Sequence, residues 1–232
     1  MMDNQDDGVP NRSDSVQLSR RAKDKLNGTR ARNQGARKSE ITRARILDAA
    51  AEVFMEKGYA LARIGDIAKK AGTQPSSIYY YFDSREAVVE EVLSIANNRT
   101  DRSVRRAIEA LHKTADLRAR ITAAIHGQVD SVLSGDPYTA AHMRIFDQIP
   151  PKMREHFLRI LDENAELWRA LLFEAQQNGL LRPEIDISVA RLLLFGMMNW
   201  SIEWYKPGRM TPDDVAEQVA LLFLDGTFVR DR

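Results

Sequence analysis

Several features are scarce in this sequence, and each absence narrows the choice of function. The 232 residues contain no cysteine, which excludes disulfide frameworks, thiolate metal sites and cysteine nucleophiles. The longest apolar stretch, residues 189–202, is interrupted by Arg191, Asn199 and Ser201 and is too short to span a bilayer. The polar N-terminus lacks the apolar core of a secretory signal. A cytoplasmic protein that does not enter a membrane is therefore expected.

Motifs of catalytic sites are also absent. The sequence has no glycine-rich phosphate loop and no nucleophile elbow. No two of its histidines are spaced as metal ligands on one helix (His112, His126, His142, His156). We therefore expect no enzyme, no catalytic residue, no metal site and no cofactor.

Positive and negative charges nearly balance, at 34 Lys and Arg against 33 Asp and Glu, but they are unevenly spread. Residues 17–45 hold ten Lys and Arg against Asp24 and Glu40, which gives 10 − 2 = +8. Few large apolar residues accompany these charges, so residues 1–38 are predicted to be a disordered basic arm. Such an arm is either a solvated tail or a segment that approaches DNA phosphates or the minor groove.

The rest of the chain shows apolar residues at helical spacing, with no sustained alternation typical of strands. This pattern predicts an all-α fold with a small three-helix domain at residues 39–90 and a larger helical bundle at residues 91–232. The first helix is expected at about residues 39–57, with Gly58 at its end. One long helix is expected from Pro151 to about Asn178.

Residues 62–82 have the pattern of a helix-turn-helix, two short helices around a glycine turn. In that motif the second helix enters the major groove of DNA by its N-terminal residues. Ser76 and Ser77 lie in the first turn of this helix. Tyr79 and Tyr80, with Tyr81 beside them, offer phenol donors to phosphate oxygens. Spacing alone leaves open a helical hairpin with a tyrosine-rich core.

Residues 39–90 resemble the DNA-binding domain of the TetR family of bacterial repressors. The resemblance rests on residues 43–54 with Gly58-Tyr59, on Ile67-Ala68 to Gly72, on residues 78–82 and on Ser84-Arg85-Glu86. It implies a homodimeric repressor that binds a palindromic double-stranded DNA operator and is released by a small effector in the second domain. Carried over by position, the DNA-binding residues are Thr42, Arg63, Gln74, Ser76, Ser77, Tyr79, Tyr80, Tyr81 and Arg85.

Two of the matching positions belong to the core of the domain, and three positions depart from the TetR family pattern. Ile78 and Phe82 match core positions and are left out of the site. Arg63 replaces the usual Thr or Ser cap of the second helix, and it is either a phosphate ligand or a solvated charge. Gly65 replaces a longer polar residue, and Gln74 is a poorer cap than Ser.

Residues 187–205 are apolar nearly all round, so they should be buried on every side. One side would face the bundle interior and the other a partner subunit, where a mid-helix glycine permits close approach. Paired with the last helix, this segment would form a four-helix interface in a homodimer. A monomeric core helix is the alternative. The predicted interface residues are Leu193, Gly196, Val215, Val219, Leu222 and Phe223.

Methionine and aromatic side chains of the bundle are candidate walls of an apolar effector pocket, although each one could be ordinary core. The C-terminal part resembles the branch of the family that regulates fatty-acid or steroid-ring breakdown, which implies an acyl-CoA thioester effector. A chromosome-organising, nucleoid-associated DNA-binding protein without a ligand is the alternative. The candidate pocket residues are Met143, Phe146, Phe157, Trp168, Met197, Trp200 and Trp204, and the candidate phosphate partners are Arg144, Arg154 and Arg182.

Overall fold

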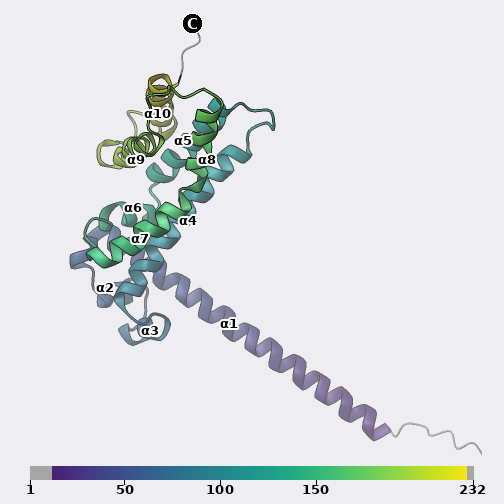
Figure 1. Ribbon diagram of the computed structural model, residues 1–232. Helices are drawn as coiled ribbons and strands as arrows, with labels where there is room; N and C mark the ends of the chain where they lie inside the picture. The colour runs from purple at the N-terminus through teal and green to yellow at the C-terminus, as the bar shows by residue number, and fades with distance from the viewer. Residues whose placement is uncertain (1–11, 229–232) are drawn as a thin grey trace, which may run out of the picture. The chain divides into compact units, whose positions relative to one another are not determined.

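The computed structural model describes residues 12–228, with the side chains of residues 36–162 and 165–228. All elements of this part are helices, as predicted (Figure 1). None of them is long and apolar enough to cross a membrane. The helices are α1 (Arg12–Leu61), α2 (Ile64–Lys70), α3 (Pro75–Tyr81), α4 (Arg85–Glu109), α5 (Leu117–Leu133), α6 (Pro137–Ile145), α7 (Pro151–Asn164), α8 (Glu166–Gln177), α9 (Ile187–Trp204) and α10 (Pro212–Thr227).

Helix α1 begins at Arg12, not near Ser39 as expected. Residues 12–38, predicted to be disordered, are helical in this structure. The segment contains no proline and is rich in Arg, Lys, Gln and Ala, which favour helix even without apolar residues to bury. The chain divides into two compact units between Arg45 and Ile46.

In the second unit, α1 is interrupted at Gly58, whose φ of 72° lies in the left-handed region. Because this conformation strains residues with a Cβ, the expected glycine stop is confirmed. A Cβ at Gly58 would also lie 2.8 Å from Oε1 of Gln148, which accepts a hydrogen bond from the backbone N–H of Tyr59 at 2.9 Å. The end of α1 is thus held by the segment that follows α6.

A first hydrophobic cluster joins α1, α2, α3 and the first half of α4 around buried Phe54, Ile67 and Ile78. Helices α6 and α7 pack into this same cluster through residues such as Phe157. Tyr138 of α6 also donates a 2.7 Å hydrogen bond to Oδ1 of Asp48, and burial raises the pKa of this phenol. The core around the N-terminal helices therefore does not end at residue 90, and the expected domain boundary there stays a prediction.

A second cluster joins the end of α4 to α5, α8, α9 and α10. Helices α4 and α5 cross closely at Gly127, where a Cβ would lie 2.7 Å from Cα of Val104. The single helix expected up to Asn178 is wrong, because the chain breaks at Ala165 between α7 and α8. This break lets Phe157 pack in the first cluster while Trp168 packs in the second.

Candidate functional site

Helix α3 is anchored by its apolar residues and displays its polar ones. Ile78 is fully buried and Phe82 nearly so, as predicted for core positions. On the other side of the helix, the side chains of Tyr79 and Tyr80 are 55% and 79% exposed, and Ser76 is exposed as well. Large aromatic side chains with a hydroxyl, held in water by a rigid helix, can donate to phosphate oxygens or base edges.

The remaining predicted residues of this helix are only partly accessible. Ser77 is half-buried, and its backbone N–H donates to the carbonyl of Gln74 at 3.0 Å. Gln74 is exposed and precedes the helix without a side-chain capping bond, as its poor capping chemistry predicts. Tyr81 is half-buried, and its ring meets that of Tyr80 edge-on at 5.0 Å. Tyr81 therefore supports the position of Tyr80.

Arg63 and Thr42 occupy different surroundings. Arg63 is exposed at the start of α2, and its backbone N–H donates to Oδ2 of Asp66 at 3.1 Å. Asp66 thus satisfies the backbone N–H of Arg63, whereas a Thr or Ser in place of Arg63 would accept from the backbone N–H of Asp66. Thr42, in the first unit, is half-buried, and its hydroxyl donates to the carbonyl of Lys38 at 3.0 Å.

Arg85, predicted to hold a DNA phosphate, is used inside the protein. Its Nε donates to the carbonyl of Ala62 at 3.0 Å, and its Nη2 donates to the carbonyl of Tyr59. The guanidinium also lies 4.1 Å from the centre of the Tyr59 ring. With these donors directed at the end of α1 and the loop that follows it, Arg85 holds the start of α4 against that segment.

Ion pairs fasten α2 to α1. Lys57 binds Asp66 at 2.7 Å, and this contact holds the pKa of the Asp66 carboxyl below its usual value. Lys70 binds Glu52 at 2.8 Å and Glu56 at 2.5 Å, and these carboxylates raise its pKa. The two lysines therefore position α2 rather than remaining open to a polyanion.

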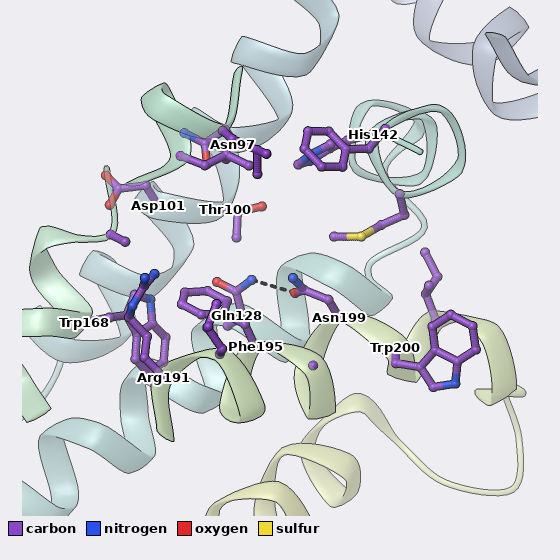
Figure 2. Close-up of a pocket in the computed structure, with 18 of the residues that line it drawn as sticks. Asn97, Thr100, Asp101, Gln128, His142, Trp168, Arg191, Phe195, Asn199 and Trp200 are labelled. Atoms are coloured by element: carbon purple, nitrogen blue, oxygen red, sulfur yellow. Dashed lines mark hydrogen bonds between the residues drawn. The ribbon is translucent and has the colours of Figure 1, made fainter. Parts of the chain in front are cut away.

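A cavity of about 540 Å³ lies among α4, α5, α6, α7, α8 and α9, the size of a small-molecule site. Four of the seven predicted pocket residues line it: Met143, Phe146, Trp168 and Trp200. In Figure 2, Trp168 and Trp200 stand at opposite ends of the opening. The remaining three do not line it. Phe157 is buried behind His142 and Phe146, while Met197 and Trp204 line a separate groove between α9 and α10.

Polar lining residues of this cavity were missed by the sequence analysis. Asn97, Thr100, Gln128, His142 and Asn199 all face it. The available signal was a polar residue among apolar neighbours, as with Asn199 in the apolar run of α9 or Gln128 at a buried position of α5. Such positions are hydrogen-bonded inside a protein or face a ligand.

The face formed by α9 and α10 is apolar and exposed. Leu193 and Leu222 are 64% and 67% exposed, and among the described residues nothing beyond the neighbouring residues and backbone of α9 itself lies within 4 Å of a Cβ built on Gly196. The other three predicted interface residues, Val215, Val219 and Phe223, are buried in the monomer. Val215 and Val219 form the floor of the groove between the two helices. Leu192, Trp200 and Trp204 also line this groove and are exposed, and Val189 and Leu221 are further exposed apolar residues of these two helices.

Among the side chains that the structure describes, no group of three or more His, Asp or Glu is arranged to hold a metal ion. The imidazole of His142 sits against the rings of Phe146 and Phe157, with centroid distances of 5.4 and 5.7 Å. Burial lowers its pKa to about 4, so the ring is neutral near pH 7.

Two family models match separate parts of this chain. Residues 46–92 match the model of bacterial regulatory proteins of the tetR family, and residues 114–227 match a tetracyclin repressor-like C-terminal domain. The chain is 30% identical to the HTH-type transcriptional repressor KstR2 of Rhodococcus jostii over 186 residues, which cover 79% of this chain and 90% of that protein.

Two solved structures share the fold. AibR, in complex with isovaleryl coenzyme A and operator DNA, has a TM-score of 0.69 at 19% identity and covers 78% of this chain and 97% of its own. FadR of Bacillus subtilis, in complex with stearoyl-CoA, has a TM-score of 0.65 at 22% identity and covers 79% of this chain and 98% of its own. From the two family models and the KstR2 relative, this chain belongs to the TetR family and is a transcriptional repressor of that family, not an enzyme.

Proposed function

We propose that two copies of this chain bind one palindromic operator, each with α3 in a major groove, and that a small effector in the cavity releases them. The observation that carries the proposal is the pair of exposed tyrosines on α3, Tyr79 and Tyr80, held in place by buried Ile78 and Phe82. Half-sites read by paired helices lie about one helical turn, ~34 Å, or slightly more apart.

The proposed dimer uses the apolar face of α9 and α10. Exposed contiguous apolar surface of this kind marks an interaction site in a protein that acts in water. A two-fold axis beside Gly196 would bring two copies of α9 together, because a glycine in mid-helix allows close approach of a partner helix. Residues Leu193 and Leu222 would then be buried.

Helix α4 connects the effector cavity to the reading helix. It begins at Ser84 and Arg85, directly after α3, and its residues Asn97, Thr100 and Val104 line the cavity. An effector that fits only one position of α4 would favour the state of the dimer that has α4 in that position, and so change the separation of the two α3 helices. The effector's difference in affinity for the two states limits how far it can shift the equilibrium between them. Acyl-CoA thioesters are the first effectors to test, because the AibR and FadR structures contain them.

The basic segment 17–45 is proposed to strengthen binding by contacting phosphates beside the operator. Its local charge of +8 supports this role, since each phosphate contact adds about 0.9 to the slope of log affinity against log salt. Deletion of residues 1–37 should lower that slope, and an unchanged slope would reduce the segment to a passive tail. Action on chromosomal DNA would place the protein in the cytoplasm, next to the nucleoid.

The reading-helix proposal is tested with DNA selected from a random library by the full chain. Tyr80→Ala should weaken binding to the selected DNA about 10- to 100-fold without changing the oligomeric state, and Tyr80→Phe is the control that removes only the hydroxyl. Equal affinity of wild type and Tyr80→Ala in fluorescence anisotropy would contradict the assignment. A ligand-free chromosome organiser would show no effector-dependent release of this DNA.

A further inference from the structure

The cavity is lined by a cluster of uncharged polar side chains together with aromatic and charged ones. Asn97 and Thr100 come from α4, Gln128 from α5, His142 from α6 and Asn199 from α9. Figure 2 shows Asn97 and Thr100 on one side and the Gln128–Asn199 pair opposite them, with Trp168 and Trp200 toward the two ends. Helices α4, α5 and α6 follow one another in the chain and α9 comes later, and the fold gathers their polar groups at one place.

Only part of the hydrogen-bonding capacity of these groups is used within the protein. Nε2 of Gln128 donates to Oδ1 of Asn199 at 3.0 Å, and the hydroxyls of Thr100 and Ser131 share a bond of 2.9 Å. An amide has one acceptor oxygen and two N–H donors, so Gln128 and Asn199 each keep capacity beyond this bond. Gln128 is 95% buried, which leaves the cavity as the place where that capacity can be met.

His142 adds a donor and an acceptor without adding a charge. Its ring touches Phe146 and Phe157 and lines the cavity, and no hydrogen bond of the described residues involves it. The low pKa of about 4 keeps the imidazole neutral, with one nitrogen donating and the other accepting. A neutral imidazole suits a carbonyl or hydroxyl group and offers no countercharge to a carboxylate.

Most of the charged side chains that line the cavity are already in ion pairs. Asp101 binds Arg105 at 2.8 Å, and Asp147 binds Arg154 at 3.1 Å. Asp162 binds Arg191, the one arginine among the lining residues that the structure describes, at 3.4 Å. Glu203 adds a further negative charge to the lining. The rim thus carries no surplus of positive charge for phosphate groups.

The candidate phosphate partners from the sequence do not change this balance. Arg154 is bonded to Asp147 and to the carbonyl of Phe146, and Arg182 lies 3.7 Å from Glu184. Neither of these, nor Arg144, lines the cavity. Phosphates of a bound thioester would therefore remain outside it.

We infer that the enclosed part of the effector is uncharged and carries oxygen: an apolar body with a ketone or hydroxyl group that bonds to His142 and to the Gln128–Asn199 pair. This inference rests on the proposed effector role of the cavity and specifies the chemistry of what fills it. A plain hydrocarbon chain would displace water from these polar groups without replacing its hydrogen bonds. Sites built to hydrogen-bond a ligand reject the analogue that lacks the polar group by large factors.

The test uses isothermal titration calorimetry of the full-length protein and compares thioesters of one chain length with one bicyclic ketone. The probes are decanoyl-CoA, decanoyl-CoA with a single ketone at carbon 3, 6 or 9, and the uncharged bicyclic ketone 1-decalone. At least one ketone-bearing ester should bind ten-fold or more tightly than decanoyl-CoA. Decanoyl-CoA binding as tightly as every ketone-bearing ester would overturn the inference while leaving the effector role intact.

Two further outcomes separate the inference from the proposed function. Binding of 1-decalone with no binding of any thioester would support the inference and overturn the acyl-CoA assignment. No binding of any probe would overturn both. In each case a shift in DNA affinity on adding the bound probe reports whether the cavity controls the reading helices.

Variants assign the preference to named side chains. His142→Phe and Asn199→Leu should each reduce the ketone preference at least ten-fold and leave decanoyl-CoA binding equal or tighter. Met143→Leu, an apolar exchange in the same lining, is the matched control and should keep the preference. If a variant melts well below the wild type, Asn97→Leu provides a third substitution on a separate helix. Retention of the preference in all folded polar-to-apolar variants would overturn the assignment.

Discussion

Two surfaces of this chain hold large side chains in water, and they differ in chemistry. On α3 the exposed groups are Tyr79 and Tyr80, each an aromatic ring that ends in a hydroxyl. On α9 and α10 they are Leu193, Leu222 and Trp200, which offer carbon surface almost alone. Within residues 46–228, α3 lies at one end and α9 and α10 at the other, with α4 running between (Figure 1).

The difference indicates what kind of partner each surface takes. Hydroxyl-bearing aromatics bind a polar partner such as a phosphate backbone, and that binding weakens with salt. Leucine and valine surface gains only by leaving water, so its natural partner is another apolar face. The cavity proposed to hold the effector adjoins the second surface, since Leu192, Gly196 and Trp200 line both the cavity and the groove between α9 and α10.

The largest expected effect comes from placing a charge on the apolar face. Leu193→Asp should weaken dimerisation about 1,000-fold, roughly 4 kcal/mol, because an unpaired carboxylate would be buried between two copies. Since Leu193 is 64% exposed in the single chain, the fold itself should be unaffected. Sedimentation velocity over a range of concentrations measures the change.

The matched control is Leu61→Asp, at the end of α1, where the leucine is 71% exposed. This variant should sediment like the wild type. An unchanged dimerisation constant for Leu193→Asp would show that the apolar face of α9 and α10 is not the subunit interface.

A smaller effect is expected on the free energy of unfolding when two arginines near α3 are replaced. Arg85→Ala should lower the free energy of unfolding by about 3 kcal/mol, because it leaves the partly buried carbonyls of Tyr59 and Ala62 without their charged donor. Arg63→Ala, at an exposed site, should change stability by less than about 0.5 kcal/mol. Urea titration of both variants checks this contrast, and equal stability of the two would contradict the internal role of Arg85.

Low pH should reduce the stability of the protein through His142, which lines the cavity and belongs to neither surface. Because His142 has a pKa of about 4 in the folded protein and about 6.5 when unfolded, the unfolded state binds more protons between these values. Stability therefore falls as pH drops, by about 2 kcal/mol between pH 7 and pH 5. Over the same pH range, the free energy of unfolding of His142→Phe, measured by urea titration, should fall by about 2 kcal/mol less than that of the wild type. A parallel loss in wild type and variant would refute this source of acid sensitivity.

The sequence predicted most of the first surface because its signals are local. The family resemblance placed Ile78 and Phe82 in the core, and their burial orients Tyr79 and Tyr80 outward on α3. The role of Arg85 could not be predicted in this way. Its partners are carbonyls of residues 59 and 62, and only the folded loop between α1 and α2 brings them within reach.

The residues that line the cavity were harder still to predict from the sequence. Met143, Phe146, Trp168 and Trp200 were recognised by residue type, but Phe157 has the same composition signal and lies in the core instead. Whether an apolar side chain lines a cavity or fills a core depends on packing between helices distant in sequence. The five polar lining residues come from four helices and share no common motif that could reveal them.

The smallest expected effect comes from adding a single methyl group to the apolar face of α9. Gly196→Ala should raise the free energy of unfolding of the single chain by up to about 1 kcal/mol, since alanine favours helix and nothing within 4 Å obstructs its Cβ. Gly65→Ala in α2, equally open, should give the same gain and serves as the control. Only Gly196→Ala should also weaken dimerisation, about ten-fold, because the added methyl group would separate the paired α9 helices. If both alanines stabilise the chain and neither alters sedimentation, α9 helices do not approach each other at Gly196, and the subunit contact must then be centred on α10.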